Sequence, residues 1–520
     1  MRTLHALAGV TAAALFAGAA AADEITIALG AEPTSMDPHY WSGAPNVAMG
    51  RNIFDHLVNP NAAYQMKPGL AASWKALDDT TWEFTLREGV KWHDGAPFTA
   101  DDVIFTFKHA PDAGLKQFSP YIKGRVVKKI DDHKVLITTE GPDPLVPNNM
   151  AAFSVVSAKH GQGAKPEDYN TGRVTIGTGP FKFVEWISGD RIVLEANPDY
   201  WGGKAAWDKV TLKPIKSGPS RIAALISGDV DMVDYVPTTD VAQLRKNSKI
   251  EISQGPSARV IFIQLDVSRD VTPYVFDNAG KPMFPNPLRD WRVRQAINLA
   301  LDRRGIVDRV MDNNAVAASQ ILAKGFFGFS DAIEIPKADP EAARQLLKKA
   351  GYGDGFKMTI HGTNDRYDND SQILEAWAQM LTKIGIETQV DAMPKATFFS
   401  RAGGSNPEFS FSLSANGSRT GEASVPLKAF CHSRWPGTGF GVYSRSRYSN
   451  QRLDPIIEEA LVTIDDAKRL KLFHQAMQIC MRDAAHIPSH YQVNTWGLRK
   501  GLNYAPRVDE FTLPYGVTKG

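Results

Sequence analysis

The chain has 520 residues, with 59 Lys and Arg against 57 Asp and Glu, so its formal net charge is +2. This length is too great for one hydrophobic core and predicts about two to four domains, while 43% hydrophobic and 22% charged residues are typical of a folded globular protein. The balanced charge argues against a nucleic-acid binder, and the two cysteines exclude a disulfide-rich scaffold and a Cys-rich metal or iron–sulfur site.

The first 22 residues have the pattern of a secretory signal peptide. Arg2 precedes an apolar stretch over residues 4–16, and an Ala-rich stretch then leads to Asp23. The alternative is an N-terminal anchor helix, but the stretch is short for a bilayer span. We therefore predict a signal peptide over residues 1–22 with cleavage after Ala22, and no lipid anchor, since no cysteine stands at the cleavage point.

The rest of the chain mixes strand and helix patterns. Alternation of apolar and polar residues predicts strands at 24–29, 82–87, 134–139 and 191–196. Helical spacing and capping residues predict helices near 293–301, 340–350, 373–384, and from 454 and 466 onward. Asp101 and Asp102, which resemble a pair of catalytic acids, fit better as the capped start of a helix.

Cys480 falls on an apolar helical stripe together with Phe473, Met477 and Met481. We interpret it as a buried thiol of the core. A disulfide between Cys431 and Cys480 is the alternative, because an exported chain meets oxidising conditions.

The sequence contains none of the common catalytic signatures. It has no G-x-S-x-G, H-E-x-x-H, phosphate-binding loop or C-x-x-C motif. His486 and His490 have the spacing of metal ligands on a helix, but Pro488 between them favours ordinary histidines. The residues alone therefore indicate an exported protein without visible chemistry and predict no cofactor.

Three groups of stretches carry a resemblance to a known family. The first comprises residues 67–74 (KPGLAASW), 82–95 (WEFTLREGVKWHDG) and 97–107 (PFTADDVIFTF). The second comprises residues 177–181 (GTGPF), 197–201 (NPDYW) and 228–231 (GDVD), and the third is 290–302 (DWRVRQAINLALD). Together they resemble the family-5 extracellular solute-binding proteins of ABC importers, the dipeptide, oligopeptide and nickel receptors.

The resemblance implies an α/β fold, a two-lobed clamshell of the type II-like periplasmic binding proteins with an extra inserted domain. It places the terminal lobe in residues 23–50, 172–262 and 486–520, the inserted domain in 51–171 and the second lobe in 263–485. It also implies a monomer in the periplasm that closes on a solute and delivers it to ABC permease subunits driven by cytoplasmic ATPases.

Site residues are carried over one by one from the resemblance. Tyr40 and Trp41 are expected to form a cleft wall, and the backbone of Gly177, Thr178 and Gly179 to run along the ligand. A second-lobe loop holds Arg366, which suits a ligand carboxylate unless it forms a surface salt bridge, and Tyr367 beside it.

The sequence departs from the peptide receptors over residues 413–423. Asn416 stands where those receptors usually have a Trp, and the following amine-binding Asp is absent. Glu422 could replace that Asp, while Arg419 disfavours a cationic ligand end. A di- or oligopeptide or peptide-like ligand remains our prediction; the alternatives are a non-peptide solute (glutathione-like, sugar- or opine-like, or a nickel complex) and a ligand sensor.

Other function classes are a secreted hydrolase, which would need a nucleophile and base in one cleft, and a chaperone-like or sensory protein of the same fold. We predict binding without turnover.

Overall fold

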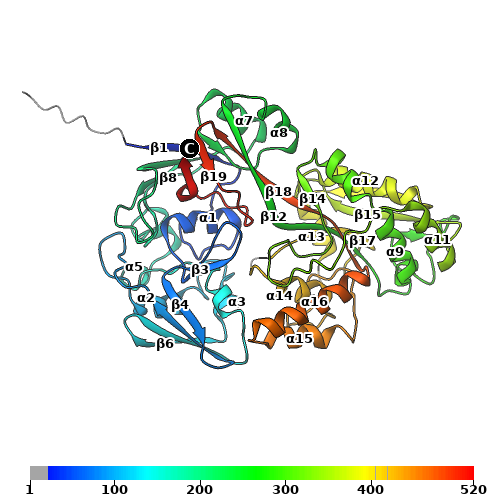
Figure 1. The fold of residues 1–520 in the computed structure, drawn as a ribbon, viewed down its shortest axis with the longest axis horizontal. Helices are drawn as coiled ribbons and strands as arrows, with labels where there is room; N and C mark the ends of the chain where they lie inside the picture. Colours follow the sequence, from blue (N-terminus) through cyan, green and yellow to red (C-terminus); the bar gives the residue numbers. More distant parts are fainter. Residues whose placement is uncertain (1–21, 404–405, 419) are drawn as a thin grey trace, which may run out of the picture.

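The computed structural model describes residues 22–520 apart from 404–405 and 419. The predicted signal peptide, except for Ala22, and Arg419 lie outside the described residues. In Figure 1 the chain forms two lobes side by side, and two long strands run from one to the other: β12 (Ile250–Leu265) and β18 (His486–Arg499).

The antiparallel ladder between β12 and β18 is interrupted between the lobes. Ile250–Pro256 pairs with Val493–Arg499, Val260–Gln264 pairs with His486–Tyr491, and the register shifts between Pro256 and Val260. The register shifts again between Ile261 and Phe262, so regular pairing of the two strands is broken where they pass between the lobes.

The terminal lobe is built on one half of a 12-stranded sheet, in the order β8-β9-β10-β1-β11-β18. β1 (Glu24–Leu29) is parallel to β10 (Lys209–Pro214) and β11 (Met232–Val233), and β8 (Phe181–Ile187) and β9 (Arg191–Ala196) extend the edge. Buried residues of β1, such as Ile25 and Ile27, pack with Trp496 of β18. This lobe also contains α1 (Ala44–Ile53), α7 (Gly218–Ser227), α8 (Thr238–Leu244), β19 (Leu502–Tyr504) and β20 (Val517–Lys519).

The region between α1 and β8 has a sheet and core of its own. Its sheet runs β4 (Ala71–Ala76), β5 (Thr81–Leu86), β7 (Lys134–Thr139), β6 (Arg125–Asp131), and its core contains Phe84, Trp92 and Ile137. The remaining elements are β2 (Val58–Pro60), β3 (Met66–Pro68), α2 (Ala100–His109), α3 (Ser119–Ile122), α4 (Val146–Asn149), α5 (Ala158–Gly161) and α6 (Pro166–Asn170). Thr99 and Asp102 form a capping box at the start of α2, which confirms that the paired acids begin a helix.

The second lobe continues the sheet in the order β13-β15-β17-β12-β18, with β16 beside β15 and β14 beside β18. Its strands are β13 (Val275–Phe276), β14 (Ala315–Ala317), β15 (Phe356–Thr363), β16 (Ile386–Met393) and β17 (Phe411–Gly417). The predicted helices here are confirmed as α9 (Trp291–Ala300), α11 (Pro340–Ala350), α12 (Asp370–Thr382), α15 (Asp454–Val462) and α16 (Asp466–Arg482). Shorter helices are α10 (Arg303–Gly305), α13 (Lys395–Ala402) and α14 (Ser424–Pro426).

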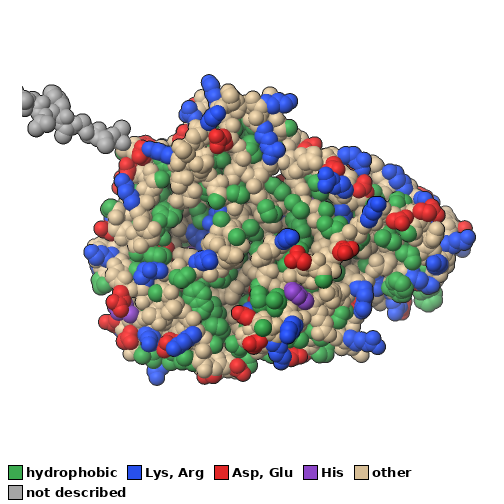
Figure 2. Space-filling view, viewed as in Figure 1, with side chains coloured by type: hydrophobic (Ala, Val, Ile, Leu, Met, Phe, Trp, Pro, Cys, Tyr) green, Lys and Arg blue, Asp and Glu red, His purple; other side chains and the backbone are tan. Residues whose placement is uncertain are grey.

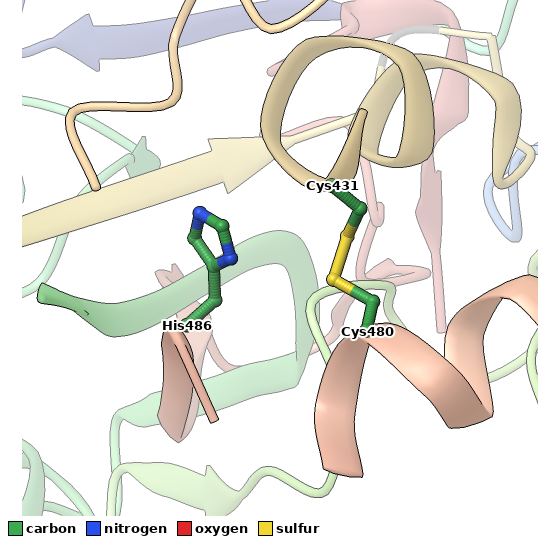
Figure 3. Close-up of side chains that lie close together, drawn as sticks. All are labelled: Cys431, Cys480 and His486. Atoms are coloured by element: carbon green, nitrogen blue, oxygen red, sulfur yellow. A yellow bond between two sulfur atoms is a disulfide. The ribbon is translucent and has the colours of Figure 1, made fainter. Parts of the chain in front are cut away.

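The interpretation of Cys480 as a free thiol is wrong. Cys431 and Cys480 form a disulfide, with 2.04 Å between the sulfur atoms and 5.8 Å between the Cα atoms (Figure 3). The reason is the packing of the turn that ends at Cys431 against α16, which the spacing of a single helical stripe does not reveal. The prediction that Cys480 is buried is confirmed.

His486, which lies beside this disulfide in Figure 3, is an ordinary core histidine, as is His490. Both lie on β18 and are fully buried, and burial lowers the pKa of each imidazole to about 3. Cys431, Cys480 and His486 stand close together, but the disulfide leaves no thiolate to bind a metal.

None of the helices in the described part of the chain has the length and apolarity needed to cross a bilayer.

Candidate ligand-binding cleft

A hollow of about 730 Å³, open to solvent, lies between the two lobes. Figure 2 shows hydrophobic side chains over this middle part of the molecule. The hollow takes residues from α1, from the region of β2–β7, from β12, from the end of β17 and from the C-terminal segment; they are Ser42, Ala44, Val47, Arg51, Tyr64, Phe118, Tyr121, Ala151, Ala152, Ala258, Arg259, Gly417, Ser418, Val508, Asp509, Glu510 and Phe511. It is therefore lined from both lobes and from the strand that connects them.

An ion pair between Arg259 and Glu510 forms part of the hollow. Arg259 Nε donates to Glu510 Oε1 at 3.0 Å and Nη2 to Oε2 at 2.7 Å, and Ser257 Oγ donates to Oε1 at 2.6 Å. Burial raises the pKa of Glu510, but the Arg259 charge outweighs it and holds the pKa below its usual value. Both charges are therefore neutralised within the protein.

Arg51, unlike Arg259, forms no ion pair with a carboxylate of the described residues. Its Nη2 donates to the Ala151 carbonyl oxygen at 2.8 Å, while its Nε is buried and has no hydrogen-bond partner. Asp509, the neighbouring carboxylate, pairs with Arg507 instead, and no carboxylate lies within ion-pair distance of Arg51 in the described residues. Burial lowers the pKa of Arg51, and the Asp509 charge opposes this shift. An arginine nevertheless stays charged, so this part of the hollow has a positive charge that the protein leaves unpaired.

The predicted residues Arg366 and Tyr367 lie in the second lobe, in the loop between β15 and α12, and do not line the hollow. The Arg366 guanidinium stands 5.2 Å from the centre of the Tyr367 ring and makes no ion pair with a described residue. Its charge contributes to the lowered pKa of Glu510, a residue that lines the hollow. Asp368 follows in the same loop. Burial of its carboxylate and the Glu510 charge raise its pKa to about 6, and its Oδ2 accepts a hydrogen bond from Gln492 Nε2 at 3.2 Å.

Tyr40 and Trp41 hold the segment before α1 against the region of β2–β7. The Tyr40 carbonyl oxygen accepts a hydrogen bond from Leu115 N at 2.8 Å, and the Trp41 ring lies so close to Gly43 that an added Cβ would come within 2.4 Å of it. Neither side chain lines the hollow, although Ser42, the next residue, does.

Gly177, Thr178 and Gly179 are buried against the end of α1. A Cβ at Gly177 would come within 1.8 Å of the Ile53 carbonyl oxygen, and Thr178 Oγ1 donates to Asp55 Oδ2 at 3.0 Å. His93 bonds to the segment on its other side, accepting from Gly177 N and donating to the Gly179 carbonyl oxygen. The predicted contact of this backbone with a ligand stays a prediction.

Asn416 and Glu422 both point into the second lobe. Asn416 Nδ2 donates to the Ile321 carbonyl oxygen at 3.2 Å. Glu422 is 1% exposed, and its Oε2 lies 3.0 Å from Arg469 Nη2. Burial raises the pKa of Glu422, and the Arg469 charge opposes this. Glu422 is thus already neutralised by a partner of its own lobe.

Arg51, Arg259 and Glu510 are charged residues of the hollow that no sequence motif indicated. Arg259 and Glu510 are 251 positions apart, and they meet because β12 and the C-terminal segment lie together between the lobes. Nothing in the local sequence around any of these residues predicts that meeting.

Known proteins match this architecture over nearly the whole chain. Residues 65–438 match the model of the bacterial extracellular solute-binding proteins, family 5 (middle region). The chain is 28% identical to the glutathione-binding protein GsiB of Escherichia coli O1:K1 / APEC over 492 residues, which are 92% of this chain and 91% of that protein.

Solved structures show the same fold. HbpA2 from Haemophilus parasuis superposes with a TM-score of 0.83 at 24% identity, covering 96% of this chain and 100% of that one. DppA from Helicobacter pylori, in complex with the peptide STSA, gives 0.73 at 23% identity, covering 95% and 98%. The predicted two-lobed α/β clamshell is confirmed, and the chain belongs to the bacterial extracellular solute-binding proteins of family 5, the substrate-binding components of ABC importers.

Proposed function

We propose that this protein captures a small peptide-like solute with at least one carboxylate, that Arg51 binds this carboxylate, and that glutathione is the first candidate. The observation that carries the proposal is Arg51, a partly buried guanidinium in the hollow. Its buried Nε has no hydrogen-bond partner, and among the described residues no carboxylate lies within ion-pair distance of it. A guanidinium can hold a carboxylate through two parallel hydrogen bonds, so a ligand carboxylate would supply what the protein does not.

The second-lobe side supports a modified peptide over an ordinary one. Glu422 is the carboxylate that could have met a peptide ammonium group there, and it is paired with Arg469. Asp368 Oδ2 accepts a hydrogen bond from Gln492 Nε2 at 3.2 Å, and its other carboxylate oxygen could meet an ammonium group of the ligand. Glutathione carries carboxylates at both of its ends and one ammonium group, and GsiB, a relative over 92% of this chain, is named as a glutathione-binding protein.

The expected setting follows from the family. We infer that residues 1–22 are removed on export, that the mature protein works as a monomer in the periplasm, and that it passes its solute to an ABC permease without altering it. Edman sequencing of protein from the periplasm should begin at Asp23, and mass spectrometry of the released ligand should return its original mass.

Calorimetric titration of the mature protein with glutathione and with unmodified di- and tripeptides tests the ligand class. Arg51→Gln should weaken binding of the carboxylate ligand about 30-fold, or about 2 kcal/mol, because a charge-assisted pair is lost. Arg344→Gln, which changes an exposed arginine paired with Glu341, serves as the matched control and should bind normally.

Amidation of the ligand separates the role of Arg51 from a general loss of structure. If Arg51 binds the ligand carboxylate, amidation of that carboxylate should weaken binding to the wild type. The amidated ligand should then have the same affinity for Arg51→Gln as for the wild type, because a double-mutant cycle assigns the lost free energy to this one pair. An Arg51→Gln variant that binds the carboxylate ligand as tightly as the wild type would overturn the proposal, and Arg51→Lys, which keeps the charge, checks that the site still folds.

A further inference from the structure

A cluster of two histidines and one aspartate lies behind one wall of the cleft and does not line the hollow. Asp37 and His39 belong to the segment between β1 and α1, and His109 is the last residue of α2. Each offers one ligand atom, and the three atoms all lie within 4.8 Å of one another. The cluster thus joins the terminal lobe to the region of β2–β7.

The hydrogen bonds of His39 leave one ring nitrogen ready to bind a metal. His39 is fully buried, and its Nε2 lies 2.8 Å from the Ser154 carbonyl oxygen, which can only accept, so Nε2 carries the proton. The lone pair is therefore on Nδ1, which is buried and has no hydrogen-bond partner. A metal-binding histidine typically has this arrangement, with its other nitrogen donating to a carbonyl or carboxylate oxygen.

His109, at the end of α2, also has a buried ring nitrogen without a hydrogen-bond partner. This nitrogen is Nε2, and the ring centre of His109 lies 5.6 Å from that of His39. Each histidine thus presents a ring nitrogen that has no partner in the protein, and a neutral imidazole is the form that binds a metal.

Asp37 completes the set with a carboxylate. It is 2% exposed, and its Oδ1 accepts a hydrogen bond from His39 N at 2.8 Å, which fixes the side chain beside the ring. The rings of Phe105, Phe118 and Phe153 pack against the histidines. An apolar shell of this kind lowers the local dielectric constant and strengthens the attraction between a cation and its ligands.

We propose that Asp37, His39 and His109 bind a divalent transition-metal ion of the zinc class. Two imidazoles and one carboxylate are a ligand set that zinc and its neighbours in the first transition row accept, with water at any remaining position. The ion would tie the segment that leads into α1 to α2. Because Phe118, which contacts His39, lines the hollow, the tie would lie directly behind one wall of the cleft.

The site can be tested on the tag-free mature protein after removal of metal with a chelator. Titration with Co²⁺, a spectroscopic substitute for zinc, should give one equivalent of bound ion with visible absorption bands of nitrogen and oxygen ligation. Zn²⁺ should displace it and raise the melting temperature, since a ligand that binds the folded state stabilises it.

Two variants identify the ligands. His109→Gln, at a partly buried position, and His39→Gln, in the core, should each weaken Zn²⁺ binding at least 100-fold, while the control His160→Gln, whose ring contacts Asp94 on the same region of the chain, should bind as the wild type does. Circular dichroism confirms that the variants fold. The proposal is overturned if the folded wild type binds less than 0.1 equivalent (roughly background), or if folded His109→Gln keeps wild-type affinity. Because the readout is metal binding without solute, its failure is distinct from a failure of the solute proposal.

Discussion

Two charged residues on opposite sides of the cleft, Glu422 and Arg51, are satisfied in opposite ways. On the second-lobe side, Glu422 is neutralised by Arg469 of α16, and the Cys431–Cys480 disulfide fixes the same segment to the same helix. On the terminal-lobe side, Arg51 has one hydrogen bond to a carbonyl oxygen and forms no ion pair with a carboxylate in the part of the chain that the structure describes. The charge available to a ligand is therefore set by what the protein has already paired, and not by which charged residues stand near the cleft.

The disulfide gives the largest expected effect on the second-lobe side. It closes a loop across 49 positions, so replacing both cysteines by alanine should lower the free energy of unfolding by about 4 kcal/mol through the entropy gained by the unfolded chain. Urea denaturation measures this loss. Wild type treated with reductant should unfold at the same urea concentration as the variant, and an unchanged midpoint in both would show that the bond does not stabilise the lobe.

Removing the carboxylate of Glu422 should have the next largest effect. Glu422→Gln leaves the buried Arg469 with one carboxylate partner among the described residues, the exposed Asp466 at 3.1 Å. It should cost about 3 kcal/mol of stability with unchanged ligand affinity. The control Glu459→Gln breaks an exposed pair with Lys468 and should cost no more than about 0.5 kcal/mol. If Glu422→Gln instead kept its stability and lost affinity, Glu422 would belong to the ligand site and the contrast between the two sides would fail.

Local patterns in the sequence predicted much of the fold because they report local physics. The strand at 134–139 alternates, and the helix at 340–350 begins after Asp339 and ends at Gly351, so the residues within each element are enough to place it. The cleft charges could not be placed in this way. Whether Glu422 is available depends on Arg469, and whether Arg51 is unpaired depends on Asp509 turning to Arg507, and both depend on tertiary contacts between distant segments.

A fall in pH should destabilise the terminal-lobe side of the protein, because His93 becomes protonated. Burial lowers the pKa of this imidazole from 6.5 to about 4, with Nδ1 accepting from Gly177 N and Nε2 donating to the Gly179 carbonyl oxygen. A folded pKa below the unfolded one contributes stability above pH 6.5, and this contribution is lost as the pH falls towards 4.

His93→Gln, a neutral side chain that can both donate and accept, tests this dependence. Between pH 7 and 5, protonation of His93 should lower the free energy of unfolding of the wild type by about 2 kcal/mol. The variant lacks this imidazole and should therefore lose that much less stability over the same range. Urea midpoints at the two pH values measure the difference. Equal losses in the two proteins would mean that other buried imidazoles, such as those of His486 and His490, account for the acid sensitivity.

The smallest effect is expected where the two sides meet. Asn148 Nδ2 of α4 donates to the Thr420 carbonyl oxygen at 2.6 Å, and beside it the Tyr64 ring lies 5.6 Å from that of Phe326, so this contact joins the lobes directly. A hinge rotation that opens the cleft must break the hydrogen bond, whereas the ion pair of Glu422 lies within one lobe and survives. Asn148→Ala should therefore shift the equilibrium towards the open form by about 1 kcal/mol and lower ligand affinity about fivefold through a faster dissociation rate, with unchanged urea stability of either lobe. Stopped-flow release of ligand measures the rate, and an unchanged rate would mean that the hydrogen bond persists in both forms and that the two sides of the cleft do not separate at this point.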